Sequence, residues 1–371
     1  MSDKIKEVFL YFFKLGFVAF GGPAAHVAMM EKDLVENKKW LTTEDFLDYM
    51  GATNLIPGPN STEMTMHCGY HRAGVAGLFV GGVSFIFPAA LLTLLVAIFF
   101  EKTSELAWMI PILNGIKAAV ISFIIGAIIK LGKKAIKTQV LLALGILTII
   151  LNVLGLNEIF CILIVGFLGL IIHLSTHNRT ANSFILPLLL MANIGYSHLK
   201  LFLIFFKVGL VLFGSGYVLF AYLDGELVSN VEWLTRPDLV EAIAIGQMTP
   251  GPVLSTATFI GYKLGGLSGA CLATLGIFIP SFFYVLLLHR FLKKMKSSKI
   301  LKAFLAAVNV AAVAVMVVVT FKMAQSIVID WRTATIGVVA CFVYFYWNKI
   351  STLWIIFGGA LSGYLLSFIT F

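Results

Sequence analysis

Two copies of a Pro-Gly-Pro tripeptide, each followed by polar residues, are the positions in this sequence best suited to hold an anion. A helix that begins after such a tripeptide exposes free backbone N–H groups and its positive dipole end, and both attract anions. Proline lacks an N–H and glycine has a free φ, so the chain can also approach a ligand closely. The predicted site consists of the two tripeptides and the polar residues after them: Pro57, Gly58, Pro59, Asn60, Ser61, Thr62, Pro250, Gly251, Pro252, Ser255 and Thr256.

A structural role is the alternative for these residues. Pro-Gly-Pro can simply kink a span, and hydroxyl groups can bond back to the preceding helical turn. Because the tripeptide occurs twice at equivalent positions, we favour the binding function.

Lys14 and Lys207 lie within apolar runs at equivalent positions, each followed by an aliphatic residue, glycine and later Phe-Gly. A lysine at the centre of a membrane helix costs roughly 2.5–3.5 kcal/mol on insertion scales. Snorkelling to an interface is the structural alternative. We expect both lysines to face inward and to contribute positive charge to the anion site. Lys117 and Lys322 also lie in apolar runs, but they are not equivalent to each other.

Glycines interrupt both lysine-bearing segments. Gly21 and Gly22, followed by Pro23, break the first, and the segment 214–216 (Gly-Ser-Gly) breaks the second. These breaks predict an unwound element beside each tip. His26 follows the first break and could donate to an anion or carry a proton, although a buried histidine with satisfied bonds is an equal alternative.

Glu63 lies in the first turn after Pro59, where a carboxylate suits the helix dipole. It would repel an anion unless protonated, so it is a candidate for coupling transport to protons. His67 and His71 have the i, i+4 spacing of a metal pair, but no third ligand lies nearby in the sequence. We therefore expect no metal, no cofactor and no catalytic residue, and we predict that the chain is not an enzyme.

The elements that position these residues form an internal repeat. The segment 13–22 (FKLGFVAFGG) corresponds to 206–215 (FKVGLVLFGS) at an offset of 193 residues, which also joins Pro57 to Pro250. Further along, the offset is 192 and joins Gly69-Tyr70 to Gly261-Tyr262. The repeat divides the chain into two halves, 1–180 and 181–371.

Composition places both halves in a membrane. The 371 residues are 60% hydrophobic and 12% charged, with a mean hydropathy of +0.97, far from the usage of soluble domains. The net charge of +9 arises from short loops between apolar runs, so it indicates orientation in a bilayer and not nucleic-acid binding. Ten membrane spans are expected: 8–30, 75–100, 110–130, 139–156, 159–174, 200–223, 267–290, 303–328, 332–348 and 351–370.

Residues 42–72 and 235–264 are too polar to span alone, and we expect each to form a re-entrant helical hairpin with Pro-Gly-Pro at its tip. Five spans per half would invert the second repeat. Loop charge supports this, because Lys133, Lys134 and Lys137 follow the third span, whereas the basic cluster 290–299 follows the seventh. With five spans per half both clusters fall on one face, the cytoplasmic one. The predicted fold is all-α, with inverted repeats of the kind found in secondary transporters.

The sequence resembles the chromate ion transporter family in its fused two-domain form. The matching stretches are FGGPAAH (20–26), WLTTEDF (40–46), PGPNST (57–62), FGSGYVL (213–219) and GQMTPGPVLSTATFIGY (246–262). The resemblance implies export of chromate from the cytoplasm across the cell membrane, with sulfate as a structural mimic. The residues by themselves reach only an oxyanion. The partners expected are this small anion and the lipid bilayer, and a homodimer is compatible with this interpretation.

Two other classes of function use the same features. An anion channel would use the same helix ends without alternating access, and a transporter of another oxyanion such as sulfate would need no other residues. An intramembrane enzyme would need a nucleophile and base or a metal, and no such set recurs in the broken segments.

Overall fold

A computed structural model describes residues 2–20, 22–176, 196–214, 216–347 and 350–369. The described part of the first half contains α1 (Asp3–Val18), α2 (Pro23–Met30), a π-helix (Glu31–Asn37), α3 (Thr43–Thr53), α4 (Asn60–Thr103), α5 (Met109–Ala135), α6 (Gln139–Val153) and α7 (Glu158–Thr176). The second half contains α8 (His198–Val211), a 3-10 turn (Gly216–Val218), α9 (Leu219–Leu223), a π-helix (Asp224–Asn230), α10 (Arg236–Met248), a 3-10 turn (Val253–Ser255), α11 (Thr256–Ser297), α12 (Lys299–Ile327), α13 (Trp331–Tyr346) and α14 (Thr352–Ser367).

The same local signals begin the equivalent helices α3 and α10. The Thr42 side chain accepts a hydrogen bond from the Asp45 N–H at 3.1 Å, and Thr235 accepts one from the Asp238 N–H at 3.3 Å. Such caps satisfy a donor that a helix start otherwise leaves free. The repeat therefore preserves helix boundaries as well as sequence.

Each hairpin consists of a short helix, the Pro-Gly-Pro tip and a second helix that turns sharply into a long one. In α4 the turn lies at Ala73 (φ −142°) and Gly74 (φ 63°), and in α11 at Gly265 (φ −150°) and Gly266 (φ 60°). Only glycine adopts these positive φ values without strain. After the turn the helices pack side by side, because a Cβ on Gly69 would overlap the carbonyl of Gly77.

The two halves interleave. Helix α5 of the first half packs against α13 and α14, and α12 of the second half packs against α6 and α7. Glycines allow this close approach, since a Cβ on Gly115 would overlap the Gly359 carbonyl of α14 and one on Gly169 would overlap Ala307 of α12. The pairs α4–α11 and α5–α12 join the halves at the centre. The larger hydrophobic core contains residues of both halves, and a smaller one lies within the first half among α1, α2, α3 and α4.

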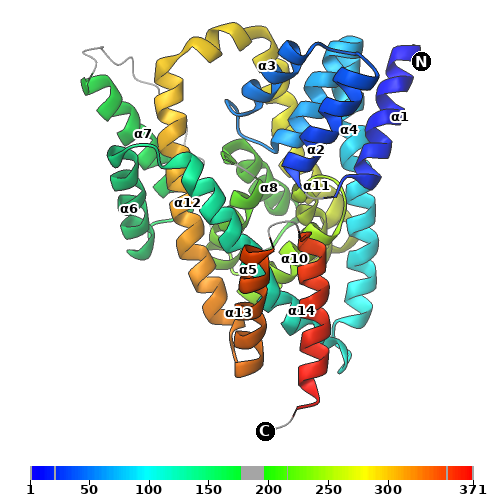
Figure 1. Cartoon of the computed structure of the whole chain (residues 1–371), viewed down its shortest axis with the longest axis vertical. Helices are drawn as coiled ribbons and strands as arrows, with labels where there is room; N and C mark the ends of the chain where they lie inside the picture. The colour runs from blue at the N-terminus through cyan, green and yellow to red at the C-terminus, as the bar shows by residue number, and fades with distance from the viewer. Residues whose placement is uncertain (1, 21, 177–195, 215, 348–349, 370–371) are drawn as a thin grey trace.

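Equivalent helices run in opposite directions in Figure 1. Helix α4 descends from the top of the view while α11 rises to it, and α5 rises while α12 descends. The two hairpin helices also lie apart along the vertical axis, with α3 near the top and α10 in the lower half.

Five helical segments of the described residues are long and apolar enough to cross a membrane: 60–103, 109–135, 158–175, 253–288 and 299–327. Helices α6 and α14 are apolar but shorter. The spans predicted at 8–30 and 200–223 are not continuous helices, because α1 ends at Val18 and α8 ends at Val211. Gly22 (φ 77°) and Gly214 (φ 103°) occupy the breaks, as the glycine pattern predicts. The protein is an all-helical, multi-pass membrane protein.

Candidate functional site

Each Pro-Gly-Pro tip is hydrogen-bonded to the broken segment of the other half. The Gly58 N–H donates to the Leu212 carbonyl at 2.8 Å, and the Gly251 N–H donates to the Ala19 carbonyl at 2.9 Å. The two glycines are equivalent at the 193-residue offset, and so are the two acceptors. The repeat thus forms one contact twice, and it holds both tips at the interface between the halves.

These bonds change the role expected of the tip amides. The N–H groups of Gly58 and Gly251 already have carbonyl acceptors, and those of Thr62, Glu63 and Ser255 donate to the proline carbonyls of their own tips. These five amides are therefore engaged in holding the tips. An anion in this conformation must find other donors.

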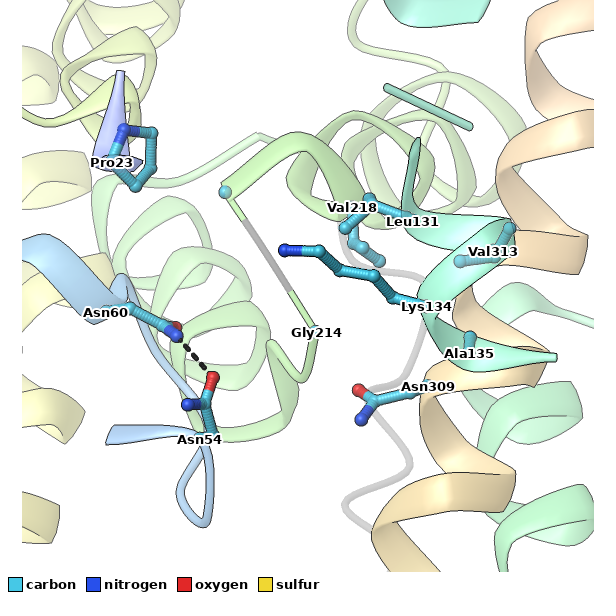
Figure 2. A pocket seen from close by; sticks show the side chains of 11 residues that line it. Pro23, Asn54, Asn60, Leu131, Lys134, Ala135, Gly214, Val218, Asn309 and Val313 are labelled. Atoms are coloured by element: carbon cyan, nitrogen blue, oxygen red, sulfur yellow. Dashed lines mark hydrogen bonds between the residues drawn. The ribbon is translucent and has the colours of Figure 1, made fainter. Parts of the chain in front are cut away.

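Such donors line a cavity of about 360 Å³ beside the first tip (Figure 2). Its lining comes from both halves: Pro23, Asn54, Asn60, Leu131, Lys134, Ala135, Gly214, Gly216, Val218, Asn309 and Val313. Asn54 caps the end of α3 and Asn60 begins α4, and their side chains bond to each other at 2.9 Å. The cavity volume is about twelve times the roughly 30 Å³ of a water molecule, so a small hydrated ion fits.

Lys134 gives the cavity its charge. Figure 2 shows its side chain extending from α5 into the cavity, opposite Asn54 and Asn60. None of the eleven lining residues is acidic. Lysine carries three donors and no acceptor, and each asparagine adds amide donors. The arrangement therefore suits an anion with several acceptor oxygens.

The structure brings only part of the predicted site to this cavity. Asn60 lines it, whereas Ser61, Thr62, Ser255 and Thr256 are buried and do not. The Thr256 hydroxyl donates to the Val253 carbonyl at 2.8 Å. Pro57, Gly58, Pro59, Pro250, Gly251 and Pro252 are buried in the contact between the halves.

The two lysines of the broken segments lie away from the cavity. Lys207 forms an ion pair with Glu226 at 2.8 Å, and Lys14 lines a separate cavity of about 540 Å³ together with Asp33. Asp33 and Glu226 are equivalent at the 193-residue offset, so each lysine has a matching acid nearby in the fold. The inward-facing cationic role predicted for Lys14 and Lys207 lacks support from this geometry.

We expect Lys207→Gln to destabilise the protein. Glu226 has a side chain that is only 3% exposed, and removing one partner of a buried ion pair costs about 3–5 kcal/mol. Thermal unfolding in detergent should show a clear fall in Tm, and Glu226→Gln in the same chain should restore part of it. An unchanged Tm for the single variant would contradict the structural role.

The Ala19 carbonyl at the first break is held by two hydrogen bonds. His26 is buried, and its Nε2 bonds to the Ala19 carbonyl at 3.0 Å, the same carbonyl that accepts the Gly251 N–H. Gly22 caps α2 with a positive φ of 77°. Gly21 lies outside the described residues. His26 therefore supports the contact between the halves in this conformation.

Glu63 is fully buried behind the first tip, and neither carboxyl oxygen has a hydrogen-bond partner among the described residues. A Cβ on Gly58 would overlap this carboxyl and would lie 2.6 Å from the Ser281 hydroxyl. The acid thus lies between the tip and α11. His67 stacks on Tyr49 and His71 bonds to the Tyr49 hydroxyl at 3.0 Å. Among the described residues, no three metal-ligating side chains form a group.

The sequence patterns missed Asn54, Lys134 and Asn309 as lining residues. Lys134 was assigned only to the charge of a loop, and Asn54, just after α3, is far in the chain from Asn309 of α12. The 192-residue offset does carry a signal, since it aligns Asn309 with the membrane lysine Lys117.

Comparison with known proteins identifies relatives over nearly the whole chain. The chromate transporter family matches residues 6–170 and 199–364. A chromate transport protein of Cupriavidus metallidurans is 29% identical over 97% of this chain and 92% of its own length. A probable chromate transport protein of Synechococcus elongatus is 30% identical over 91% and 88%, and an uncharacterized transporter of Methanocaldococcus jannaschii is 26% identical over 97% and 94%. No solved structure matches the chain.

Proposed function

The chain belongs to the chromate transporter family, and from that membership and its cavity we propose that it exports chromate, or a sulfate-like dianion, by alternating access. The observation that carries the proposal is the cavity beside the first tip. It combines one lysine, three asparagines and no acid at the interface of two equivalent halves. A tetrahedral dianion needs hydrogen-bond donors and positive charge and no covalent chemistry.

The membrane potential can supply the driving force. Moving one charge through 100 mV is worth about 2.3 kcal/mol, so outward movement of a dianion at an inside-negative potential releases about twice that amount. Export therefore needs no cofactor. Coupling to protons through the buried Glu63 carboxyl is a separate proposal, and a pH gradient imposed in the transport assay tests it.

Transport by the purified protein in lipid vesicles tests the function directly. Chromate, sulfate, molybdate and phosphate would be compared at a set membrane potential. Saturable, slow flux that prefers chromate or sulfate supports a carrier for dianions. Ohmic single-channel currents would instead support an anion channel, and preference for another oxyanion would reassign the substrate.

We also propose that the halves are inverted repeats in the membrane. The opposite courses of α4 and α11, and of α5 and α12, support this arrangement. Cysteines introduced at Lys134 and Lys299 should both react with an impermeant thiol reagent from the cytoplasmic side, because each belongs to one of the two basic clusters that the charge bias of the loops assigns to that side. Cysteines at Glu101 and Asp330 should react from outside. Labelling of Lys134→Cys and Lys299→Cys from opposite sides would rule out inversion.

A further inference from the structure

The residues that line the cavity have counterparts in the other half of the repeat. The offsets of 193 and 192 residues align Asn54 with Gln247 and Asn309 with Lys117. They also align Asp48 of α3 with Glu241 of α10. The counterparts come together as well, because α10 packs against α5 and α12. The fold thus contains a second set of polar residues related to the cavity by the repeat.

This counterpart region is closed in the present conformation. Lys117 pairs with Glu241 at 2.5 Å, with side chains only 15% and 11% exposed. Lys263 approaches Glu241 at 3.5 Å and bonds to Asp238 at 2.5 Å, so the ion pairs tie α5, α10 and α11 together. Met323 and Val253, the counterparts of Leu131 and Asn60 in the cavity lining, are buried. The counterparts of the cavity lining are here packed, as Met323 and Val253 are, or ion-paired, as Lys117 is.

The cavity and its counterpart region differ in conformation, although the repeat aligns their residues. Glu241 is buried against Lys117, whereas its counterpart Asp48 is exposed, and Asn309 lines the open cavity. Gln247 has a buried side-chain nitrogen with no acceptor among the described residues. A buried donor without an acceptor is unfavourable, and an acceptor in another conformation would offset that cost.

Each side also has a lysine that is not matched by a lysine at the equivalent position of the other side. Lys134 serves the open cavity and is equivalent to Ser326, whereas Lys117 serves the closed side and is equivalent to Asn309. The positive charge is therefore present on both sides, although it is not carried at equivalent positions.

We propose that Lys117 and Gln247 form a second oxyanion-binding position, closed by Glu241 in this conformation and opened when the two halves exchange conformations. The proposal rests on the transport function proposed above. Glu241 and the oxyanion compete for the same ammonium group, so the Lys117–Glu241 pair closes the position when no anion is there. When the halves exchange, Glu241 becomes exposed as Asp48 is now, and Lys117 and Gln247 become donors to the anion.

Reversible cross-linking of the cavity and of its counterpart region tests whether the two halves exchange conformations. Cys271 and Cys341 would first be replaced by serine, because the other two cysteines, Cys68 and Cys161, are 0% exposed. Lys117→Cys with Glu241→Cys, joined by a short reducible bifunctional thiol reagent, holds the present conformation. Asp48→Cys with Asn309→Cys, joined by the same reagent, holds the exchanged one. Each link should reduce sulfate or chromate flux at least tenfold relative to the same double-cysteine chain before linking, and reduction should return flux to that unlinked level.

Anion binding to the chain linked at 48 and 309 tests the second position itself. Lys117→Gln in that chain should weaken sulfate binding about tenfold or more, as expected for a lost charge-assisted hydrogen bond, while Lys117→Arg should retain binding. Lys133→Gln, an exposed charge outside both sites, is the matched control. Full flux through a completely linked 117–241 pair, or equal binding by the Lys117→Gln chain, would overturn the proposal.

Thiol accessibility separates failure of this inference from failure of the transport function. Gln247→Cys should react faster with a water-soluble thiol reagent in the chain linked at 48 and 309 than in the unlinked chain. This result does not depend on which anion is carried. If the unlinked chain moves no oxyanion, the transport function fails, but faster labelling at position 247 still supports opening. Unchanged labelling there overturns the exchange whatever the substrate.

Discussion

Replacing Gly58 or Gly251 with valine is expected to reduce oxyanion transport more than a hundredfold. Both glycines have positive φ values, +140° and +89°, which a β-branched residue adopts only with strain. A Cβ on Gly58 would overlap the Glu63 carboxyl, and one on Gly251 would lie 2.6 Å from the Ala89 Cβ. Each substitution therefore displaces a tip and breaks its hydrogen bond to the other half. Flux in reconstituted vesicles measures the loss.

Two other glycines provide matched controls for this experiment. Gly74 has φ +63° but nothing within 4 Å of an added Cβ, so Gly74→Ala introduces backbone strain without a clash. Gly51 lies in α3 with equally open surroundings and ordinary φ, so Gly51→Ala should transport as the parent does. If valine at both tips leaves folded protein and normal flux, the tips are bends with no part in transport.

The elements of the fold that belong to the internal repeat could be predicted from the sequence. The offset located both tips and both breaks, because local backbone requirements such as Gly22 and Gly214 at positive φ act on residues near in the chain. Hydropathy predicted spans at 75–100 and 303–328, and these correspond to parts of the long apolar helices 60–103 and 299–327. It also overestimated the continuity of the first span of each half, since an apolar run stays apolar across a glycine break.

The partners of polar groups could not be predicted in the same way. The sequence predicted free N–H groups where a helix begins after each tip, but it gave no sign that the Gly58 N–H donates to Leu212, 154 residues further along the chain. Lys207 was expected to face the anion, but the π-helix brings Glu226 to it. A pattern within one segment indicates which groups need partners. Which groups supply them depends on packing between segments far apart in sequence.

Lys134 is the residue whose assigned role changes most between sequence and structure. As a loop charge it would set only the orientation of the chain, whereas in the cavity it is the only charged residue of the lining. These two roles make different predictions, because orientation depends on the sum of basic residues in a loop and binding depends on one position. A single substitution can therefore distinguish them.

Lys134→Gln is expected to raise the apparent Kd for chromate or sulfate by about ten- to a hundredfold, since a charge-assisted hydrogen bond contributes about 1.5–3 kcal/mol. The side chain is exposed and forms no ion pair among the described residues, so its loss should leave folding unchanged. Binding of labelled sulfate to the purified protein at several salt concentrations measures the effect. The deficit should be largest at low salt, where the lost charge is least screened.

Lys133→Gln is the control that makes this result specific. Lys133 is exposed and lies next to Lys134 in the last turn of α5. Lys133→Gln therefore removes the same charge from the same region, but Lys133 does not line the cavity. If orientation is what matters, the two variants should lose surface-resolved labelling and transport together. If Lys134 binds the anion, only Lys134→Gln should lose affinity, and Lys134→Arg should recover part of it by restoring the charge. Equal affinities for the Lys133 and Lys134 variants would remove the cavity from the transport pathway.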